Sequence, residues 1–275
     1  MVLIDLHTHS NHSRGRKIPT EALPRPRDMI RVAKQRGLAG IALTDHDSID
    51  GWKEAAAEAK KQGMIFIQGE EVSTARGHIL ALGITEHIPR GLSVQETMDQ
   101  IHEQGGIGIA SHPFDIAGQG VRYDAKYTDA VEAWNALSID RFSNYLNNRK
   151  AERLGKPKVS GSDAHTLDMI GTAPIRTTAT TLDDILKSIL KQQVTLTKQY
   201  VSIRSIQTWS QERFKRSYDH VWNHIANYSP PRAWISRKLL NRFVTDRSNW
   251  LFTGLAHVGI CSAAVYSACL TAAKY

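Results

Sequence analysis

Cysteine is nearly absent from this chain, and several other features that mark whole classes of protein are missing as well. Only 2 of the 275 residues are cysteine. Cys261 and Cys269 stand in an apolar stretch, where we expect small buried side chains in a reducing compartment. A disulfide framework is thereby excluded. The first residues lack a basic segment followed by an apolar one, so no secretory signal is predicted. With 41% hydrophobic residues, the composition is that of one large globular domain with an appendage.

Acidic residues are in deficit, but only in one part of the chain. The formal net charge is +8. Residues 1–200 carry 25 basic and 24 acidic side chains, whereas residues 201–275 carry 10 basic and 3 acidic ones. Nine of the 12 histidines lie between His7 and His165. The sequence therefore divides into a near-neutral, histidine-rich domain (1–200) and a basic tail (201–275), whose charge we expect to form a docking surface outside the catalytic site.

Short apolar runs alternate with amphipathic stretches through the first domain, which predicts βα units and a parallel sheet. The expected strands are Val2–Leu6, Gly40–Thr44, Ile65–Gln68, His78–Gly83, Ile107–Ala110, Ala130–Trp134 and Lys158–Gly161. The expected helices are Pro26–Arg36, Trp52–Gln62, Val94–Gln104, Arg141–Leu154 and Leu182–Lys191, several of them ended by Gly37, Gly63, Gly105 and Gly155. Seven such units in about 200 residues favour a small barrel over an open sheet.

Polar side chains gather where the expected strands end. They are His7, His9, Asp45, His46, Glu70, Glu71, His112, Asp163 and His165. The carboxyl ends of barrel strands share one face, so these residues are expected to converge on one pocket. Taken alone, His7 and His9 could be two hydrogen-bonded histidines at a strand end. The recurrence of such residues favours a metal site instead, because strand residues i and i+2 point to the same side and mixed N and O ligands suit Zn, Fe or Mn.

Six motifs, in order along the chain, carry a resemblance to a known family. They are D-L-H-T-H-S (Asp5–Ser10), L-T-D-H-D (Leu43–Asp47), G-E-E-V-S (Gly69–Ser73), G-H-I-L-A-L-G (Gly77–Gly83), S-H-P (Ser111–Pro113) and G-S-D-A-H (Gly161–His165). Together they resemble the PHP family, the polymerase and histidinol phosphatase family of metal-dependent phosphoesterases. The resemblance implies an α/β fold, a distorted (β/α)7 barrel followed here by an α-helical C-terminal extension. It also implies two or three divalent metal ions (Mn, Zn or Fe) and the hydrolysis of phosphate esters.

The resemblance further implies a role for each motif residue. A first metal ion is expected on His7, His9, Glu71 and Asp163, and a second on His78, His112 and the bridging Glu71. Gly69 fixes the register that selects Glu71, and Glu70 is expected to face a neighbouring helix. His46 and His165 resemble ligands of a third ion, with Asp45 orienting them. If free of metal, either histidine is a candidate proton donor to the leaving alcohol, so the expected catalytic set includes Glu71, Asp163, His46 and His165.

One position departs from the family pattern. Where many members have Ser-Asp-Gly after H-x-H, this chain reads Ser13-Arg14-Gly15. A guanidinium cannot ligate a cation. We expect Arg14 either to hold the substrate phosphate beside a two-metal centre or to face solvent within a charged loop. The loop Gly118–Gly120 is likewise either a source of phosphate contacts or a plain turn.

The tail has two further patterns. After an expected helix over Ile206–Tyr228 and a break at Pro230-Pro231, Arg232–Arg247 forms a basic amphipathic helix with Trp234, Ile235, Leu239, Leu240, Phe243 and Val244 on one side. Leu251–Ala273 contains no Asp, Glu, Lys or Arg and is long enough to cross a bilayer. A membrane anchor that leaves the barrel in the cytoplasm and a buried hydrophobic helix both satisfy this pattern, so membrane association through residues 232–273 stays an open alternative.

The sequence therefore predicts a stand-alone metal-dependent phosphoesterase that acts on a small phosphorylated metabolite or nucleotide. Its chemistry would be hydrolysis assisted by metal ions, without a nucleophilic side chain. One alternative is a nuclease for short oligonucleotides, with the basic tail as its electrostatic footprint. Another is a catalytically silent metal-binding module tethered by the tail.

Overall fold

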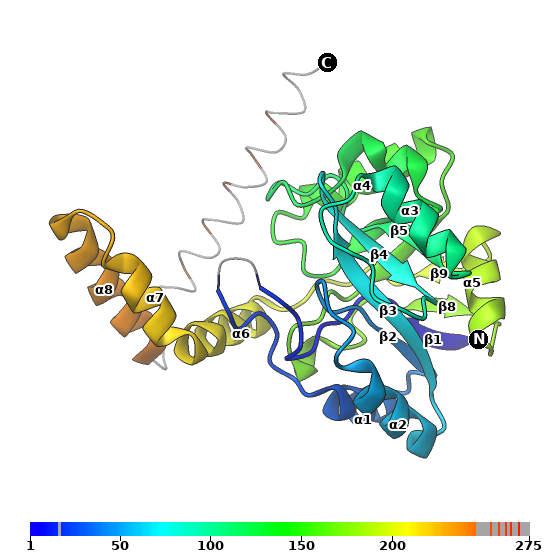
Figure 1. The fold of residues 1–275 in the computed structure, drawn as a ribbon, viewed down its shortest axis with the longest axis horizontal. Helices are drawn as coiled ribbons and strands as arrows, with labels where there is room; N and C mark the ends of the chain where they lie inside the picture. The colour runs from blue at the N-terminus through cyan, green and yellow to red at the C-terminus, as the bar shows by residue number, and fades with distance from the viewer. Residues whose placement is uncertain are drawn as a thin grey trace.

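The structure is a computed structural model that describes residues 1–15 and 18–245, together with the isolated positions 254, 258, 262, 265 and 269. Its centre is one sheet of 9 strands in the order β7-β6-β5-β4-β3-β2-β1-β8-β9 (Figure 1). The strands are β1 (Val2–Asp5), β2 (Gly40–Leu43), β3 (Ile65–Ser73), β4 (His78–Leu82), β5 (Ile107–Ala110), β6 (Ala130–Asn135), β7 (Lys158–Gly161), β8 (Ile175–Thr177) and β9 (Thr195–Leu196). A bridge between Thr8 and Ala164 joins the chain beyond β1 to the chain beyond β7. The sheet thus nearly closes into the barrel that the sequence predicted.

The direction of β4 is the main departure from the expected parallel sheet. β4 pairs antiparallel with both β3 and β5, whereas the pairs β1–β2, β2–β3, β5–β6 and β6–β7 are parallel. β8 and β9 are two further short strands that the sequence pattern did not indicate, and β8 also runs antiparallel to β1. Because β4 is reversed, its first residue, His78, lies at the same end of the barrel as the carboxyl ends of the parallel strands. β3 is longer than expected, so Glu70 and Glu71 lie inside it.

The helices of the barrel begin and end close to the expected positions. They are α1 (Pro26–Gln35), α2 (Trp52–Gln62), α3 (Val94–Glu103), α4 (Phe142–Arg153) and α5 (Leu182–Leu190), with short 3-10 helices at Arg122–Tyr127 and Leu167–Met169. α3 begins with a capping box, in which Ser93 and Glu96 satisfy each other's backbone amides. Gly63 ends α2 with a φ of 62°, a left-handed conformation that glycine adopts at little cost.

The strands are buried on both faces, which explains their unbroken apolar runs. In β4, Ile79 and Ala81 belong to an outer core shared with the helices, and Leu80 and Leu82 belong to an inner core. Helices α1 and α2 lie along one side of the sheet, and α3 and α4 lie along the opposite side (Figure 1). The barrel end that carries the carboxyl ends of β1, β2 and β7 is left for polar residues.

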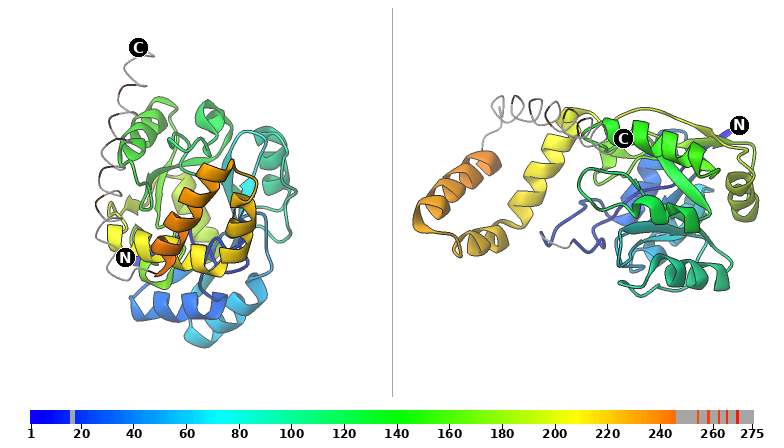
Figure 2. Two further views of the ribbon diagram at one scale, coloured as in Figure 1. Left: turned by 90° about the vertical axis from the view of Figure 1, so that its left-hand side faces the viewer. Right: turned by 90° about the horizontal axis from the view of Figure 1, so that it is seen from above.

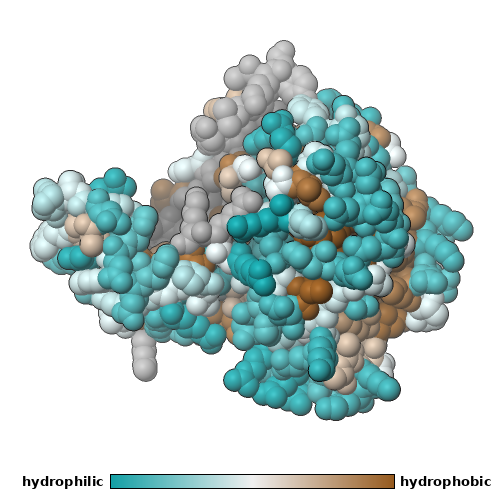
Figure 3. Space-filling view, viewed as in Figure 1, coloured by the Kyte–Doolittle hydropathy of each residue, from teal (hydrophilic) through white to brown (hydrophobic). Residues whose placement is uncertain are grey.

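Three helices after residue 200 form an arm that projects from the barrel (Figures 1 and 2). They are α6 (Ile203–Arg216), α7 (Tyr218–Ile225) and α8 (Pro230–Thr245). The single helix expected over Ile206–Tyr228 is wrong, because Ser217 separates α6 from α7. Pro230 begins α8 rather than only breaking the chain, since a first-turn proline removes no intrahelical hydrogen bond. On the face seen in Figure 3 the arm is mostly hydrophilic.

The apolar side expected for α8 is divided between two environments. Leu240 is buried, and the ring of Phe243 packs 5.7 Å from that of Phe214 in α6. Trp234, Ile235 and Leu239 are exposed, with Trp234 at 65%. α8 therefore packs on the arm with one edge and presents the other to its surroundings.

The structure bears on the C-terminal predictions only in part. Within residues 1–15, 18–245 and the five isolated positions, the helices do not combine the length and the apolar character that a bilayer crossing requires. Most of Leu251–Ala273, including Cys261, lies outside the described residues, so the anchor stays a prediction. Cys269 is exposed, and its predicted burial is therefore wrong.

Candidate metal centre

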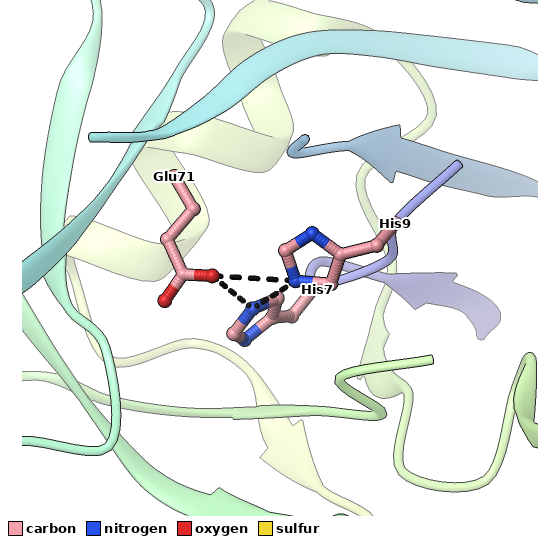
Figure 4. A group of neighbouring side chains, drawn as sticks. All are labelled: His7, His9 and Glu71. Carbon is pink, nitrogen blue, oxygen red and sulfur yellow. Dashed lines mark hydrogen bonds and ion pairs between the residues drawn. The ribbon is translucent and has the colours of Figure 1, made fainter. Parts of the chain in front are cut away.

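The carboxylate of Glu71 lies in the middle of a cluster of imidazole rings. Its Oε2 is 3.1 Å from His7 Nε2, 3.2 Å from His9 Nε2 and 3.3 Å from His46 Nε2 (Figure 4 shows the first two). Its Oε1 faces another pair, 3.3 Å from His78 Nδ1 and 3.2 Å from His112 Nε2. Each oxygen of one buried carboxylate thus has its own set of nitrogens.

A second carboxylate, that of Asp163, completes one side of the cluster. Its Oδ1 lies 3.4 Å from His7 Nε2, 3.2 Å from His9 Nε2 and 3.5 Å from His165 Nδ1. Three compact groups result, each with one ligand atom per residue within 4.8 Å of the others: His7–His9–Glu71, His9–Asp163–His165 and His46–Glu71–His78. All eight residues expected to hold metal are brought together. His46 and His165 belong to different groups, whereas the sequence had paired them on one ion.

The donor set fits divalent cations. The ring nitrogens of His7 and His9 face each other at 3.0 Å, both directed at Glu71. The Nδ1 atoms of His46, His78 and His112 are buried and lack a hydrogen-bond partner among the described residues. Buried polar atoms without partners cost free energy, and converging imidazole and carboxylate ligands are the environment of Zn, Fe or Mn. Of the three, His78 Nδ1 faces Glu71, so a cation held between them would give this nitrogen a partner.

The ionisation of the cluster follows from burial and from these short contacts. Burial alone would raise the pKa of Glu71, but His46, His7 and His78 hold that pKa well below its usual range. Burial alone would lower the pKa of His9, but hydrogen bonds to Asp163 and Glu71 raise it to about 9. Burial lowers the pKa of His46 to about 3 and that of His165 to about 4. His46 and His165 are therefore neutral imidazoles at pH 7, which favours the ligand role over the proton-donor role.

The backbone at the strand ends is shaped for this cluster. His112 and Asp163 have φ angles of 28° and 49°, which non-glycine residues rarely adopt and which concentrate at functional sites. Gly161 leaves room beside them, because a Cβ atom there would lie 2.3 Å from Glu132 Oε1 and 2.6 Å from His7 Cβ. A glycine at this position allows His7 and Glu132 to approach.

Glu132 is a functional residue that the sequence reasoning missed. It lies in the middle of β6 with 0% exposure and accepts a hydrogen bond from His7 Nδ1 at 2.9 Å. It also accepts from the His112 backbone amide and from Asn135 Nδ2, both at 3.0 Å. This contact fixes His7 so that Nε2 points at Glu71, the arrangement by which outer carboxylates orient metal-bound histidines. The sequence feature that could have indicated Glu132 is a single carboxylate within the mostly apolar run Ala130–Asn135 (AVEAWN).

Three other acidic residues differ from expectation. Glu70 does not face a helix: it accepts hydrogen bonds from His87 Nδ1 at 2.7 Å and the Ile88 amide at 3.1 Å, in the segment after β4. Asp45 accepts from the Ser10 amide and hydroxyl, so it orients the loop next to His9 rather than His46. Glu21, which the sequence did not single out, lies 3.8 Å from His46 Nε2.

The structure bears on the two alternative roles expected for Arg14 and for the loop Gly118–Gly120. Arg14 is 62% exposed and lies 3.4 Å from Asp50, yet it also lines a cavity beside His46 and His78. Its role in phosphate binding stays a prediction. In the loop Gly118–Gly120, the amides of Gln119 and Gly120 both donate to Asp115 at 2.9 Å. Those two amides form a turn rather than a phosphate cradle.

Two cavities adjoin the cluster, and the arm helps to line both. One, of about 390 Å³, is lined by His112, Asp163, Ile116, Leu137, Ile139 and Trp209 among others. The other, of about 280 Å³, is lined by Arg14, Glu21, His46, Ser73, His78, Ala117, Gly118, Gln119 and Arg213. The Trp209 ring also packs 4.6 Å from that of His165. The expectation that the tail lies apart from the site is therefore wrong for α6.

Two segments of the chain match known family models. Residues 5–109 match the family model described as the PHP domain, and residues 142–194 match the model described as PHP-associated. An uncharacterized protein of Methanocaldococcus jannaschii is 37% identical over 149 residues, which cover 52% of this chain and 86% of that protein. A 3',5'-nucleoside bisphosphate phosphatase of Chromobacterium violaceum is 46% identical over 88 residues, which cover 30% of this chain and 28% of the phosphatase.

Two further similarities concern activity class and fold. A 5'-3' exoribonuclease of Haemophilus influenzae is 32% identical over 150 residues, which cover 51% of this chain and 52% of the nuclease. A solved two-domain protein of Bacteroides vulgatus, described as containing a predicted PHP-like metal-dependent phosphoesterase, superposes with a TM-score of 0.59 at 16% identity, covering 72% of this chain and 65% of that one. The last similarity concerns the fold alone. Residues 195–245, including α6, lie beyond both matched family models.

Proposed function

This chain belongs to the PHP family of metal-dependent phosphoesterases, and on that premise we propose that it hydrolyses phosphate esters of a small phosphorylated metabolite or nucleotide. The observation that carries the proposal is the position of Glu71, whose two carboxylate oxygens face separate sets of imidazoles. A carboxylate placed in this way suits a pair of metal ions that share one ligand.

The chain offers a defined set of ligands for these ions. His7, His9, Glu71 and Asp163 would hold the first, and Glu71, His78 and His112 the second. For a third ion, His46 and His165 are the family-type ligands, and Glu21 offers a carboxylate 3.8 Å from His46 where the family aspartate is replaced by Arg14. When bound, such ions lower the pKa of a coordinated water and stabilise charge on phosphoryl oxygens. Glu132 keeps His7 in the required orientation through Nδ1.

The size of the site supports a small substrate. The cavities of about 390 and 280 Å³ lie just above and just below the lower limit of about 300 Å³ for small-molecule sites. One is lined by apolar side chains such as Leu137 and Ile139, which suit an organic group, and the other by Arg14 and Arg213, which suit a phosphate. A nucleoside phosphate or a similar metabolite ester matches this division.

The experiment is a hydrolysis assay with the full-length protein loaded with Mn²⁺, on a panel of phosphomonoesters and phosphodiesters. We expect hydrolysis of small monoesters that His9→Ala abolishes and His102→Ala retains. His102 is the matched control, because it is an exposed histidine that pairs with Asp129 at 3.0 Å, outside the cluster. Absence of hydrolysis across the whole panel by the fully loaded wild type would replace this proposal with the silent metal-binding module.

The basic arm and the similarity to an exoribonuclease support a second candidate, a nuclease for short oligonucleotides. Binding to a polyanion releases counterions, so its affinity must fall as salt rises. Oligonucleotide binding measured from about 50 to 200 mM salt tests this candidate. An affinity that stays constant over this range argues against it.

A further inference from the structure

Helix α6 is fastened directly to the loop that follows the first metal-binding motif. Trp209 Nε1 donates to the Glu21 carbonyl at 2.7 Å, and Arg213 Nε donates to the Thr20 carbonyl at 3.0 Å. The Thr20 amide donates to Ser217 Oγ at 3.2 Å. Trp209 and Arg213 are four residues apart and therefore lie on one face of the helix. This face of α6 forms one wall of the site.

Arg213 lies at the wall of the smaller cavity with part of its hydrogen-bonding capacity unused. The guanidinium carries five N–H donors, and its Nε alone is engaged by Thr20. It lies over the Trp209 ring at 5.1 Å, which fixes its plane. Within the part of the chain that the structure describes, no carboxylate lies at ion-pair distance from Arg213, although Glu21 lines the same cavity. Its terminal nitrogens are thus available to an anion.

The two cavities differ in the charge of the side chains that line them, so a substrate phosphate is expected to occupy one of them rather than the other. The smaller cavity is lined by two arginines, Arg14 and Arg213, against one carboxylate, Glu21, together with histidines of the cluster. The larger one is lined by Asp115, Asp140 and Asp163, and its lining within the described residues includes no arginine or lysine. A phosphate is repelled by the second set of charges and attracted by the first.

We propose that Arg213 of α6 binds the substrate phosphate, opposite Arg14, so that the arm completes the active site of the barrel. The inference rests on the proposed function, since it concerns the anion that a phosphoesterase must hold. Arginine suits this role because its planar donors match phosphate oxygens in pairs. Trp209, on the same face of α6, would border the organic part of the substrate in the larger cavity.

A purely structural role for Arg213 is the rival explanation, because Nε already fastens the loop. The chain provides a control for it in Arg216, on the same helix. Arg216 Nη1 donates to the carbonyl of Leu23 in the same loop at 3.5 Å, but Arg216 is exposed and does not line the cavity. Both arginines touch the loop, and Arg213 alone of the two faces the cavity.

The test measures the binding of inorganic phosphate to the full-length, Mn²⁺-loaded protein by calorimetry. We expect Arg213→Gln to weaken binding about tenfold, the effect of one charge-assisted hydrogen bond, and Arg213→Lys to restore part of the loss. Arg216→Gln should stay within about twofold of wild type. Melting temperature and metal content are recorded for every variant. If Arg213→Gln folds poorly, the phosphate affinity of Arg213→Lys is compared with that of wild type instead.

Unchanged phosphate affinity in Arg213→Gln overturns the proposal, and so does an equal loss in Arg216→Gln, which would assign the effect to the loop. Hydrolysis is measured on the same samples to separate this inference from the proposed function. If phosphate binding depends on Arg213 but no ester is hydrolysed, the inference stands and the proposed function fails. If esters are hydrolysed and Arg213→Gln changes neither phosphate affinity nor KM, the inference alone fails.

Discussion

The barrel and the arm contribute to the same site in different ways. The barrel supplies histidines and carboxylates that are almost wholly buried, such as His9 at 0% and Glu71 at 1% exposure. α6 supplies Trp209 and a half-buried Arg213 from a surface helix beyond the family match. The ligand cluster stands on the ends of sheet strands, whereas the wall from α6 is held by the packing of Trp209 in the core and by hydrogen bonds to one loop. The metal-ligand cluster thus lies largely in the part of the chain that the family models cover, and the wall from α6 lies beyond it.

The largest effect is expected from detaching the arm. Trp209 belongs to the barrel core at 9% exposure, so Trp209→Ala should lower the free energy of unfolding by about 3 kcal/mol. Trp234→Ala on α8, where the side chain is 65% exposed, should change it by less than about 0.5 kcal/mol. Urea unfolding of both variants checks the pair. Equal stabilities would mean that the arm is not part of the folded unit.

A smaller effect, on metal binding by the barrel residues, is expected from Glu132→Gln. The variant replaces the acceptor of His7 Nδ1 with a neutral amide, so metal affinity should fall by about 10- to 100-fold. Glu152→Gln, which affects an exposed carboxylate paired with Lys158, serves as the control. Metal titration by calorimetry measures both. An unaltered affinity in Glu132→Gln would show that the orientation of His7 does not depend on this contact.

A change of pH tests the ligand cluster without any substitution. Although burial opposes it, contacts with Asp163 and Glu71 raise the pKa of His9 to about 9, and contacts with Glu71 raise that of His112 to about 9. Protonation of these groups stabilises the metal-free fold below their ordinary pKa of about 6.5, and this stabilisation is lost as pH rises through about 9. The melting temperature of the metal-free protein should therefore fall over this window.

The metal-loaded protein should show the opposite trend, because metal ligands must lose their protons and apparent affinity rises with pH. Thermal melts with and without EDTA from about pH 6.5 to 9 measure both curves. Below pH 6.5 the lowered pKa values of His46 and His165 matter, because the unfolded chain binds protons there that the folded chain does not. The metal-free protein therefore also loses stability as the pH falls below this window. Parallel curves for the two forms would argue against metal ligation by His9 and His112.

The fold was predictable where local chemistry decides it. The helices α1 to α5 begin and end within a residue of expectation, because capping residues and C-terminal glycines mark their ends. The direction of β4 was not predictable, since an apolar run has the same pattern in either orientation. The division of the tail at Ser217 was missed for a related reason, because the amphipathic pattern continues across the junction.

The site was predictable from residues that stand in recognisable motifs, and less so from those that do not. His7, His9 and Glu71 do lie together, as their motifs suggested. Glu132 is a single carboxylate within an apolar strand, and the sequence does not reveal that it faces inward. Arg213 belongs to a helix whose contact with Thr20 joins residues 193 positions apart, and no local pattern specifies such a contact.

The attachment of α6 to the loop at Thr20 and Glu21 also sets an order of assembly. A nascent chain emerges from its N-terminus, so every metal ligand is synthesised before Trp209 and Arg213. During that interval the loop lacks the two donors that later fasten its carbonyls. The ligand set is therefore complete in the chain before the wall that Trp209 and Arg213 provide.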